Sequence, residues 1–174
     1  MVLKLQNVEK HYEKFDLQCS LEVHKGCVTG LIGQNGAGKS TTFKAVLGLI
    51  AIDGGKIELF GKDIKKIGTE EREKLGVVLS DSGFSGYLCI KDIIPVMASM
   101  YPGFDKVEFE KRCRTFEIPF DKKIKDFSTG MKAKLKVLVA MSHKASLLIM
   151  DEPTAPLTDN EVEILFKLVR NLKK

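Results

Sequence analysis

The residues that most clearly indicate chemistry form a glycine-rich segment in the N-terminal part of the chain. They fit the pattern G-x-x-x-x-G-K-S/T and are Gly33, Gln34, Asn35, Gly36, Ala37, Gly38, Lys39 and Ser40. In such a loop successive backbone N–H groups converge on phosphate oxygens, and the positive end of a following helix adds to the attraction. We expect Lys39 to reach the β- and γ-phosphates of a nucleotide and the Ser40 hydroxyl to bind Mg²⁺. The alternative interpretation is an ordinary glycine-rich turn.

Two carboxylates form a second candidate group. The apolar run 146–150 predicts a buried strand, and Asp151 and Glu152 follow at its carboxyl end, where open parallel sheets bind ligands. Asp151 would hold the Mg²⁺ shell there, and Glu152 would be the base that polarises water for an in-line displacement. Acidic residues also follow strands as helix caps, so the pair is informative only together with the glycine-rich segment.

Strands that could position these groups follow from the hydrophobic pattern. Near-alternation over 2–8 and 15–23 predicts antiparallel strands, and the apolar run 27–32 predicts a strand that leads into the glycine-rich segment. A helix is expected directly after that segment. Further short strands are expected at 56–60 and 75–79.

Helical patterns dominate the second half of the chain. From residue 82 to about 127 we expect helical segments, with prolines as punctuation at Pro95, Pro102 and Pro119. An amphipathic helix is predicted at 131–143 and a last helix at 160–172. The first of these should carry on one side Met131, Leu135, Leu138 and Val139.

These elements favour an α/β fold of the P-loop NTPase (RecA-like) type, with a mostly parallel sheet and an antiparallel β edge. The whole chain, 1–174, would be one nucleotide-binding domain. Its core would comprise 1–81 and 146–174, and a helical subdomain would comprise 82–145.

Composition limits the classes of function. The 174 residues are 44% hydrophobic and 29% charged, which is typical of a soluble globular domain, and no apolar stretch approaches the roughly 18 residues of a membrane span. The net charge of +5 comes from lysines spread along the chain, which favours a solvated basic surface over nucleic-acid binding. The cysteines are far apart and predict neither a zinc site nor a disulfide framework, which suits a reducing cytosol.

Three segments together resemble the ATP-binding subunits of ABC transporters. They are Gly-Gln-Asn-Gly-Ala-Gly-Lys-Ser-Thr at 33–41, Asp-Glu-Pro-Thr at 151–154 and Phe-Ser-Thr-Gly-Met-Lys at 127–132. The last is similar to the signature segment of that family, which usually reads Leu-Ser-Gly-Gly-Gln. The resemblance implies that Thr41 belongs to the phosphate loop, and that Ser128 and Gly130 cap the γ-phosphate held by the other protomer. Taken alone, Ser128 would be a plain helix N-cap.

The resemblance also implies a set of ligands and partners. ATP and Mg²⁺ would be bound, and Tyr12 would stack on the adenine ring, although core packing is an alternative for Tyr12. A second ATP-binding subunit and a separate transmembrane permease would be the partners, on the cytoplasmic face of the membrane. The signature variant and the run 76–79 look like the ATPases of ABC-2 exporters.

The pattern departs from the family in three places. Ser80 and Asp81 stand where the family carries a glutamine, and either could bind Mg²⁺ directly or through water. Thr158 stands where an aspartate is usual, a form more like the sugar-importing ATPases. The switch histidine expected beyond residue 174 is missing together with the strands around it, which predicts a truncated or degenerate subunit.

Two other functions remain as alternatives. A nucleotide-binding scaffold with little or no hydrolysis would fit the missing histidine and the altered signature, although Glu152 argues against it. A soluble ABC-type ATPase of translation or DNA repair usually carries tandem domains or long coiled-coil insertions, and neither is visible in the sequence.

Overall fold

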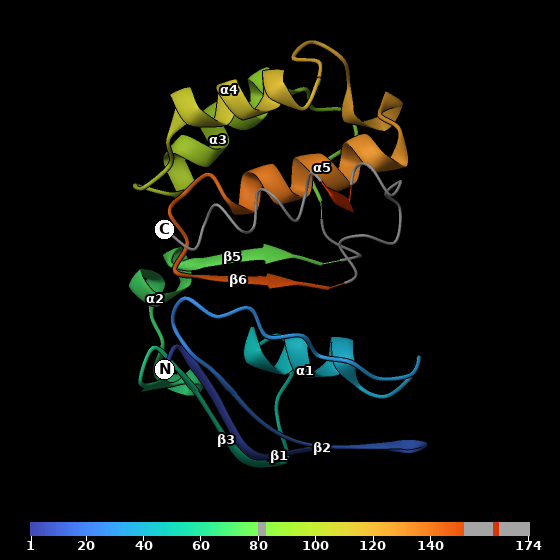
Figure 1. Cartoon of the computed structure of the whole chain (residues 1–174), viewed down its shortest axis with the longest axis vertical. Coiled ribbons are helices and arrows are strands. Elements are labelled where there is room, and N and C mark those ends of the chain that lie inside the picture. Colours follow the sequence, from blue (N-terminus) through green and yellow to red (C-terminus); the bar gives the residue numbers. More distant parts are fainter. Residues whose placement is uncertain (80–82, 152–161, 164–174) are drawn as a thin grey trace. The chain divides into compact units, whose positions relative to one another are not determined.

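The computed structural model describes residues 1–79, 83–151 and 162–163. The chain divides into two compact units, one within Met1–Arg72 and one within Glu73–Leu172. Figure 1 traces their helices and strands, and each unit is described here by itself. The division into a core and a helical subdomain at 82–145 stays a prediction.

The first unit is built on an antiparallel sheet. Its strands are paired in the order β2-β1-β3-β4. Their bounds are Leu3–Tyr12 for β1, Phe15–Val23 for β2, Gly54–Leu59 for β3 and Lys62–Asp63 for β4. Alternate side chains are buried, among them Leu3, Leu5, Leu17, Ile57 and Leu59. The predicted antiparallel β edge is therefore confirmed.

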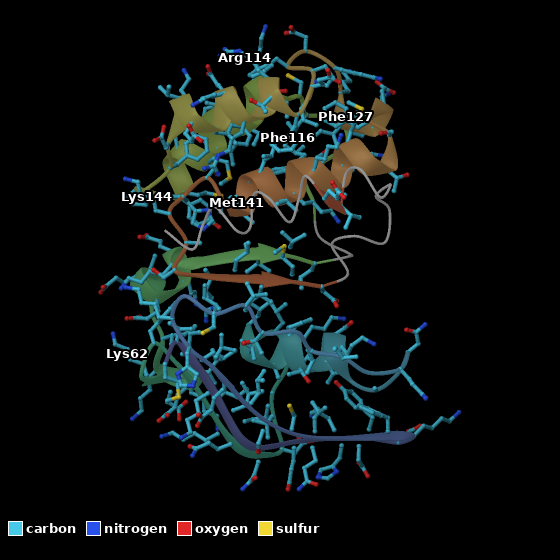
Figure 2. The ribbon with its side chains drawn as sticks, in the orientation of Figure 1. Lys62, Arg114, Phe116, Phe127, Met141 and Lys144 are labelled. Carbon is cyan, nitrogen blue, oxygen red and sulfur yellow. The ribbon has the colours of Figure 1, made fainter. Side chains whose placement is uncertain are left out.

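A helix and two short helical turns complete this unit. Helix α1, Lys39–Val46, begins directly after the glycine-rich segment, as predicted, and lies on one face of the sheet (Figure 1). The turns are η1, Ile64–Lys66, and α2, Thr69–Glu73. Lys62, labelled in Figure 2, forms an ion pair with the Glu71 carboxylate, which is only 6% exposed.

The strand predicted at 27–32 is wrong for this structure. These residues have no regular secondary structure, and Val28 and Ile32 are 65% and 96% exposed. A strand needs a neighbour for its N–H and C=O groups. Within the described part of the chain, β1 to β4 pair with one another and β5 pairs with β6, and no strand pairs with 27–32.

The second unit combines a parallel pair of strands with helices. Strands β5, Leu75–Val78, and β6, Leu147–Met150, pair in parallel from Leu75 with Leu147 to Val78 with Met150. The helices are α3 at Ile90–Met100, α4 at Lys106–Thr115, the short η2 at Ile124–Asp126 and α5 at Thr129–Ala140. This mixture of parallel and antiparallel strands with helices confirms the predicted α/β class, although the described parallel part has only two strands.

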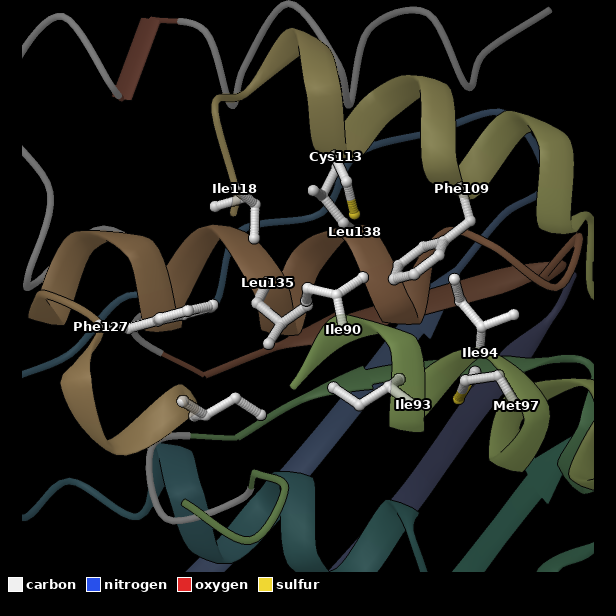
Figure 3. Packing of buried hydrophobic residues seen from close by; sticks show 11 residues of the cluster. Ile90, Ile93, Ile94, Met97, Phe109, Cys113, Ile118, Phe127, Leu135 and Leu138 are labelled. Atoms are coloured by element: carbon white, nitrogen blue, oxygen red, sulfur yellow. The ribbon is translucent and has the colours of Figure 1, made fainter. Parts of the chain in front are cut away.

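Helix α5 is buried on two sides. On one side, Leu135 and Leu138 join a cluster with residues of α3 and α4 such as Ile93 and Phe109 (Figure 3). The predicted apolar side is confirmed, because Met131 and Val139 pack against the same cluster. On the other side lies a smaller cluster with β5 and β6, formed by Val78, Val137, Ala140 and Met141.

Gly76 sets the distance between α5 and β5. A Cβ atom added to this glycine would lie 2.4 Å from the Ala140 carbonyl oxygen, which no real side chain tolerates. Further along the same two elements, the Lys136 Nζ donates to the Leu79 carbonyl oxygen at 3.1 Å. Since residue 140 lies beside residue 76 and residue 136 beside residue 79, α5 runs antiparallel to β5. Its N-terminal end is therefore directed toward the carboxyl ends of the strands.

Contrary to the prediction, Pro95 does not interrupt its helix. It lies inside α3, where it removes one backbone hydrogen bond at a cost of about 3 kcal/mol. The same helix buries Ile90, Ile93 and Met97 almost completely, and each such side chain contributes about 1.5–3 kcal/mol. Burial of the apolar face therefore outweighs the local penalty, and the helix continues to Met100.

Candidate nucleotide-binding site

The glycine-rich segment is closed into a ring by its own lysine. The Lys39 Nζ donates to the carbonyl oxygens of Gly33 at 2.8 Å and of Gln34 at 2.9 Å. The Ala37 N–H also donates to the Gln34 carbonyl, at 3.1 Å. The side chain of Lys39 therefore folds back over the loop, and its positive charge lies beside the backbone that an anion would approach.

Gly38 is the residue on which the loop turns into α1. It has φ +90, a left-handed conformation that favours glycine, and it is the N-cap of the helix without a side-chain cap. Its carbonyl oxygen accepts hydrogen bonds from the Thr42 N–H at 2.8 Å and the Thr42 Oγ1 at 2.9 Å. The first amides of α1 are thus not capped by a side chain, and the positive end of the helix is directed at the loop.

Most of the loop residues predicted to bind phosphate are open to solvent, whereas Gly38 is buried and Lys39 is half-buried. Gln34, Asn35, Gly36, Ala37 and Ser40 are exposed, and Thr41 is half-buried. A loop that presents backbone N–H groups in this way at the start of a helix is suited to bind a phosphate chain. The arrangement argues against an ordinary turn, which needs neither the hydrogen bonds from Lys39 back to the loop nor the following helix.

Tyr12 lies at the end of β1 and is 47% exposed as a residue, which argues against core packing. The Phe15 ring is stacked beside it, with centroids 6.4 Å apart. The Lys10 Nζ lies 5.7 Å from the Tyr12 ring centroid and 2.9 Å from the Asp53 carboxylate. The His11 backbone N–H and the Lys10 ammonium together lower the pKa of Asp53, so its negative charge holds Lys10 in place. Tyr12 is therefore a partly exposed aromatic residue at the end of the strand, with Phe15 and Lys10 as neighbours.

In the second unit, Asp151 is buried at the end of the parallel strands. The residue is only 5% exposed, and its backbone N–H donates to the Val78 carbonyl oxygen at 2.8 Å. This hydrogen bond continues the β5–β6 pairing by one residue. Asp151 thus lies at the edge of the sheet where the carboxyl ends of β5 and β6 meet. Ser80, Asp81, Glu152 and Thr158 lie outside the described residues, as does the helix predicted at 160–172 except for 162–163.

Ser128 begins the signature helix. Its Oγ accepts a hydrogen bond from the Met131 N–H at 3.2 Å, so it is the N-cap of α5. Gly130 lies in the first turn, half-buried. Phe127 and Met141, labelled in Figure 2, mark the two ends of the helix, and both are buried. Ser128 is itself exposed, so its cap role does not prevent a ligand from reaching the amides of this helix start.

The donors predicted for Mg²⁺ belong to both units. Ser40 offers a hydroxyl in the first unit and Asp151 a carboxylate in the second, and oxygen donors of these kinds suit Mg²⁺. Among the residues that the structure describes, no three His, Cys, Asp or Glu side chains group together as a protein-only metal site.

A family model described as "ABC transporter" matches residues 17–155 of the chain. The ribose import ATP-binding protein of Clostridium tetani is 36% identical over 165 residues, covering 88% of this chain and 33% of that protein. The linearmycin resistance ATP-binding protein of Bacillus subtilis is 32% identical over 182 residues, covering 99% of this chain and 58% of that protein. This chain therefore spans only part of the curated relatives that it matches.

Solved structures agree with the sequence comparison. A structure described as the ATP binding subunit of an ABC transporter superposes with a TM-score of 0.86 at 25% identity, covering 99% of this chain and 75% of that one. A dimeric ATP-binding cassette in a post-hydrolysis state with ADP and Pi has the same fold, with a TM-score of 0.83 at 20% identity. The chain belongs to the ABC transporter family, and its fold is the P-loop fold of the ATP-binding subunits. Within the described ranges, no helix is both long and apolar enough to span a membrane.

The structure adds three residues that sequence patterns did not single out. Phe15 and Leu17 lie against Gly38, and Lys136 binds the carbonyl of the residue before Ser80. Phe15 and Leu17 could have been noticed because they continue the alternating apolar positions of β2 toward the hairpin. Lys136 has no such signal, since a lysine in a helix gives no indication of which carbonyl it will reach.

Proposed function

We propose that this chain is an ATP-binding and ATP-hydrolysing subunit of an ABC transporter. The observation that supports it most is the glycine-rich loop, in which Lys39 closes a ring beside exposed backbone and Gly38 opens α1 without a side-chain cap. A triphosphate would replace the two carbonyl oxygens as the partner of Lys39, because charge-assisted hydrogen bonds to phosphate are the stronger interaction.

Each remaining group would have one task in this proposal. Tyr12 would carry the adenine ring on its exposed face. Ser40 and Asp151 would hold Mg²⁺, which supplies charge neutralisation at the phosphates, with Ser80 or Asp81 as further donors. Glu152 would accept the proton of the attacking water. Lys39 would stabilise the negative charge that develops on the transferred phosphoryl group.

Partners follow from how the signature segment would be used. Two ATP-binding subunits would join head to tail, and Ser128 and Gly130 of each would cap the γ-phosphate bound by the other. The exposed Ser128 at the start of a helix buried on both sides supports this role, since the helix start is accessible but held rigidly. A separate permease would couple this closure to transport at the cytoplasmic face of the membrane.

The direction of transport is proposed to be export, of the ABC-2 type. The signature variant Ser-Thr-Gly-Met-Lys carries this proposal, and the relatives include a bacitracin transport ATP-binding protein of Enterococcus faecalis, 32% identical over 156 residues. Other relatives are ribose import proteins. Transport assays on membranes that contain this chain together with its permease would decide between the two directions.

Hydrolysis is tested by single-turnover release of phosphate from ATP, comparing the chain with its Glu152→Gln variant. We expect phosphate release by the natural chain and a loss of at least about 100-fold in the variant, because a general base contributes about 10²–10⁴-fold. Equal rates in both would remove the enzymatic part of the proposal. ATP binding without phosphate release would leave a nucleotide-binding scaffold in its place.

A further inference from the structure

Phe15 lies between the exposed ring of Tyr12 and the glycine that opens α1. The two aromatic residues are direct partners across the β1–β2 hairpin, and their rings are inclined by 28°. The other end of the Phe15 ring is directed at Gly38, since a Cβ atom added to Gly38 would lie 2.7 Å from Phe15 Cζ and 3.3 Å from Cε1. The Phe15 side chain therefore lies next to both Tyr12, the candidate adenine platform, and Gly38 of the candidate phosphate loop.

Gly38 is held from both sides. Phe15 and Leu17 contact it from β2, and Leu17 Cδ1 would lie 2.8 Å from the same added Cβ. From the opposite direction, Thr42 donates two hydrogen bonds to the Gly38 carbonyl oxygen. The left-handed conformation of Gly38 sets the direction of the amides at the start of α1. Anything that displaces the Phe15 ring therefore bears on the geometry of those amides.

We propose that Phe15 is a positioning residue that couples the adenine platform to the phosphate loop. Adenine stacked on Tyr12 restricts the Tyr12 ring, the Tyr12 ring restricts Phe15, and Phe15 keeps Gly38 in the conformation that presents its neighbours' amides to phosphate. The inference rests on the proposed nucleotide binding and goes beyond it, because it assigns a role in phosphate affinity to a side chain that need not touch the nucleotide.

Two substitutions of Phe15 separate its contact with Tyr12 from its contact with Gly38. Phe15→Leu shortens the side chain and withdraws it from Gly38. Phe15→Tyr keeps the aromatic ring beside Tyr12 but adds an oxygen at Cζ, the atom nearest to Gly38. Phe116→Leu is the matched control, because Phe116 is also a half-buried phenylalanine but packs on the core cluster of the second unit.

The 174-residue variants are titrated by calorimetry with Mg-ATP and with inorganic tripolyphosphate, which lacks a base. We expect both Phe15 variants to bind tripolyphosphate roughly five- to tenfold more weakly than the natural chain, a size typical of coupling between residues in contact. Tyr12→Ala should weaken ATP binding most, and it should weaken tripolyphosphate binding less than the Phe15 variants do, because it only loosens Phe15. In the Tyr12→Ala/Phe15→Leu double variant the loss of ATP affinity should be smaller than the product of the two single losses.

Thermal unfolding provides the readout that separates positioning from mere packing. Phe116→Leu should lower the unfolding temperature and leave tripolyphosphate affinity unchanged, whereas both Phe15 variants should lose tripolyphosphate affinity for a similar drop in unfolding temperature. Natural tripolyphosphate affinity in both Phe15 variants would overturn the inference while ATP binding by the natural chain still stood. Loss of affinity only in step with loss of stability would overturn it too. If the natural chain bound neither ligand, the proposed function would fall first, and the inference with it.

Discussion

The phosphate loop of the first unit and the signature helix of the second are built by different forces. The loop at 33–37 is exposed and is shaped by backbone hydrogen bonds and the folded-back side chain of Lys39, and only Gly38 at its end is buried, against Phe15 and Leu17. Helix α5 is held by apolar clusters on two sides. A backbone loop can rearrange around an incoming anion at little cost, whereas a close-packed helix transmits strain.

This contrast predicts where substitutions will act. Changes in the loop should alter ligand affinity and leave the free energy of unfolding nearly unchanged, because few buried contacts are lost. Changes in the clusters around α5 should lower the free energy of unfolding first. Four measurements test this contrast, beginning with the largest expected effect.

The largest effect is expected for Lys39→Ala. Removing the ammonium that faces the phosphates should weaken Mg-ATP binding by at least about 100-fold, the sum of two or more charge-assisted hydrogen bonds. The free energy of unfolding should change by only about 1 kcal/mol, because its two present acceptors are exposed carbonyls. Calorimetry and urea unfolding measure the two quantities, and the exposed Lys44→Ala in the same helix is the control. Unchanged ATP affinity would contradict the role given to the loop.

Leu138→Ala tests the opposite side of the comparison. Leu138 is fully buried in the cluster shown in Figure 3, so truncation should lower the free energy of unfolding by about 2–5 kcal/mol through lost burial and a cavity. Met100→Ala removes a similar volume from an exposed site of the same unit and should cost less than about 0.5 kcal/mol. Urea unfolding measures both. Equal effects would mean that α5 is not held by its apolar cluster.

The effect of Glu71→Gln on the free energy of unfolding should depend on pH. The Lys62 ammonium and the Gly68 N–H bind the Glu71 carboxylate and lower its pKa from 4.5 to about 2. Because the pKa is lowered by folding, the charged group stabilises the fold fully above its unfolded pKa, and this is lost as the pH falls toward about 2. The stability advantage of the natural chain over Glu71→Gln should therefore shrink between pH 6 and about 3. Urea unfolding across this pH range measures it, and an advantage that stays constant would contradict the assignment.

The smallest disturbance to the protein is labelling of its thiols. Burial raises the pKa of the Cys113 thiol to about 12, whereas Cys27 is exposed. At pH 8 only about one in 10⁴ Cys113 thiols is ionised even before access is considered, so iodoacetamide should label Cys27 and spare Cys113. Mass spectrometry locates the label, and the same reaction in urea is the control. Equal labelling in the folded chain would show that the α3–α4–α5 cluster opens readily.

Sequence patterns predicted the parts of this fold that depend on local spacing. Strand alternation located β1 and β2, and the G-x-x-x-x-G-K-S pattern located both the loop and the start of α1. The apolar side of α5 was also predicted, because helical periodicity is a local property. The α/β class and the family followed from these elements in combination.

The predictions that failed, and the features that sequence patterns missed, depend on neighbours that are distant in the sequence. The run 27–32 has the composition of a strand, but pairing needs an edge that composition does not report. Pro95 sits inside α3 because tertiary burial outweighs a local preference. The second buried side of α5, at Val137 and Ala140, was hidden because a helix covered on both sides loses the contrast that periodicity measures. Of the candidate site residues, the structure describes the loop, Tyr12, Ser128, Gly130 and Asp151, and their roles remain predictions.

Gly76 carries no chemistry of its own, yet it determines how closely a strand and a helix of the second unit approach. With the Ala140 carbonyl oxygen 2.4 Å from where a methyl group would be, even alanine would push α5 away from β5 and shift the helix start that carries Ser128. A saturation-mutagenesis screen for function should therefore find position 76 intolerant of every replacement. In such a profile this glycine would be as restricted as a catalytic residue, for a purely steric reason.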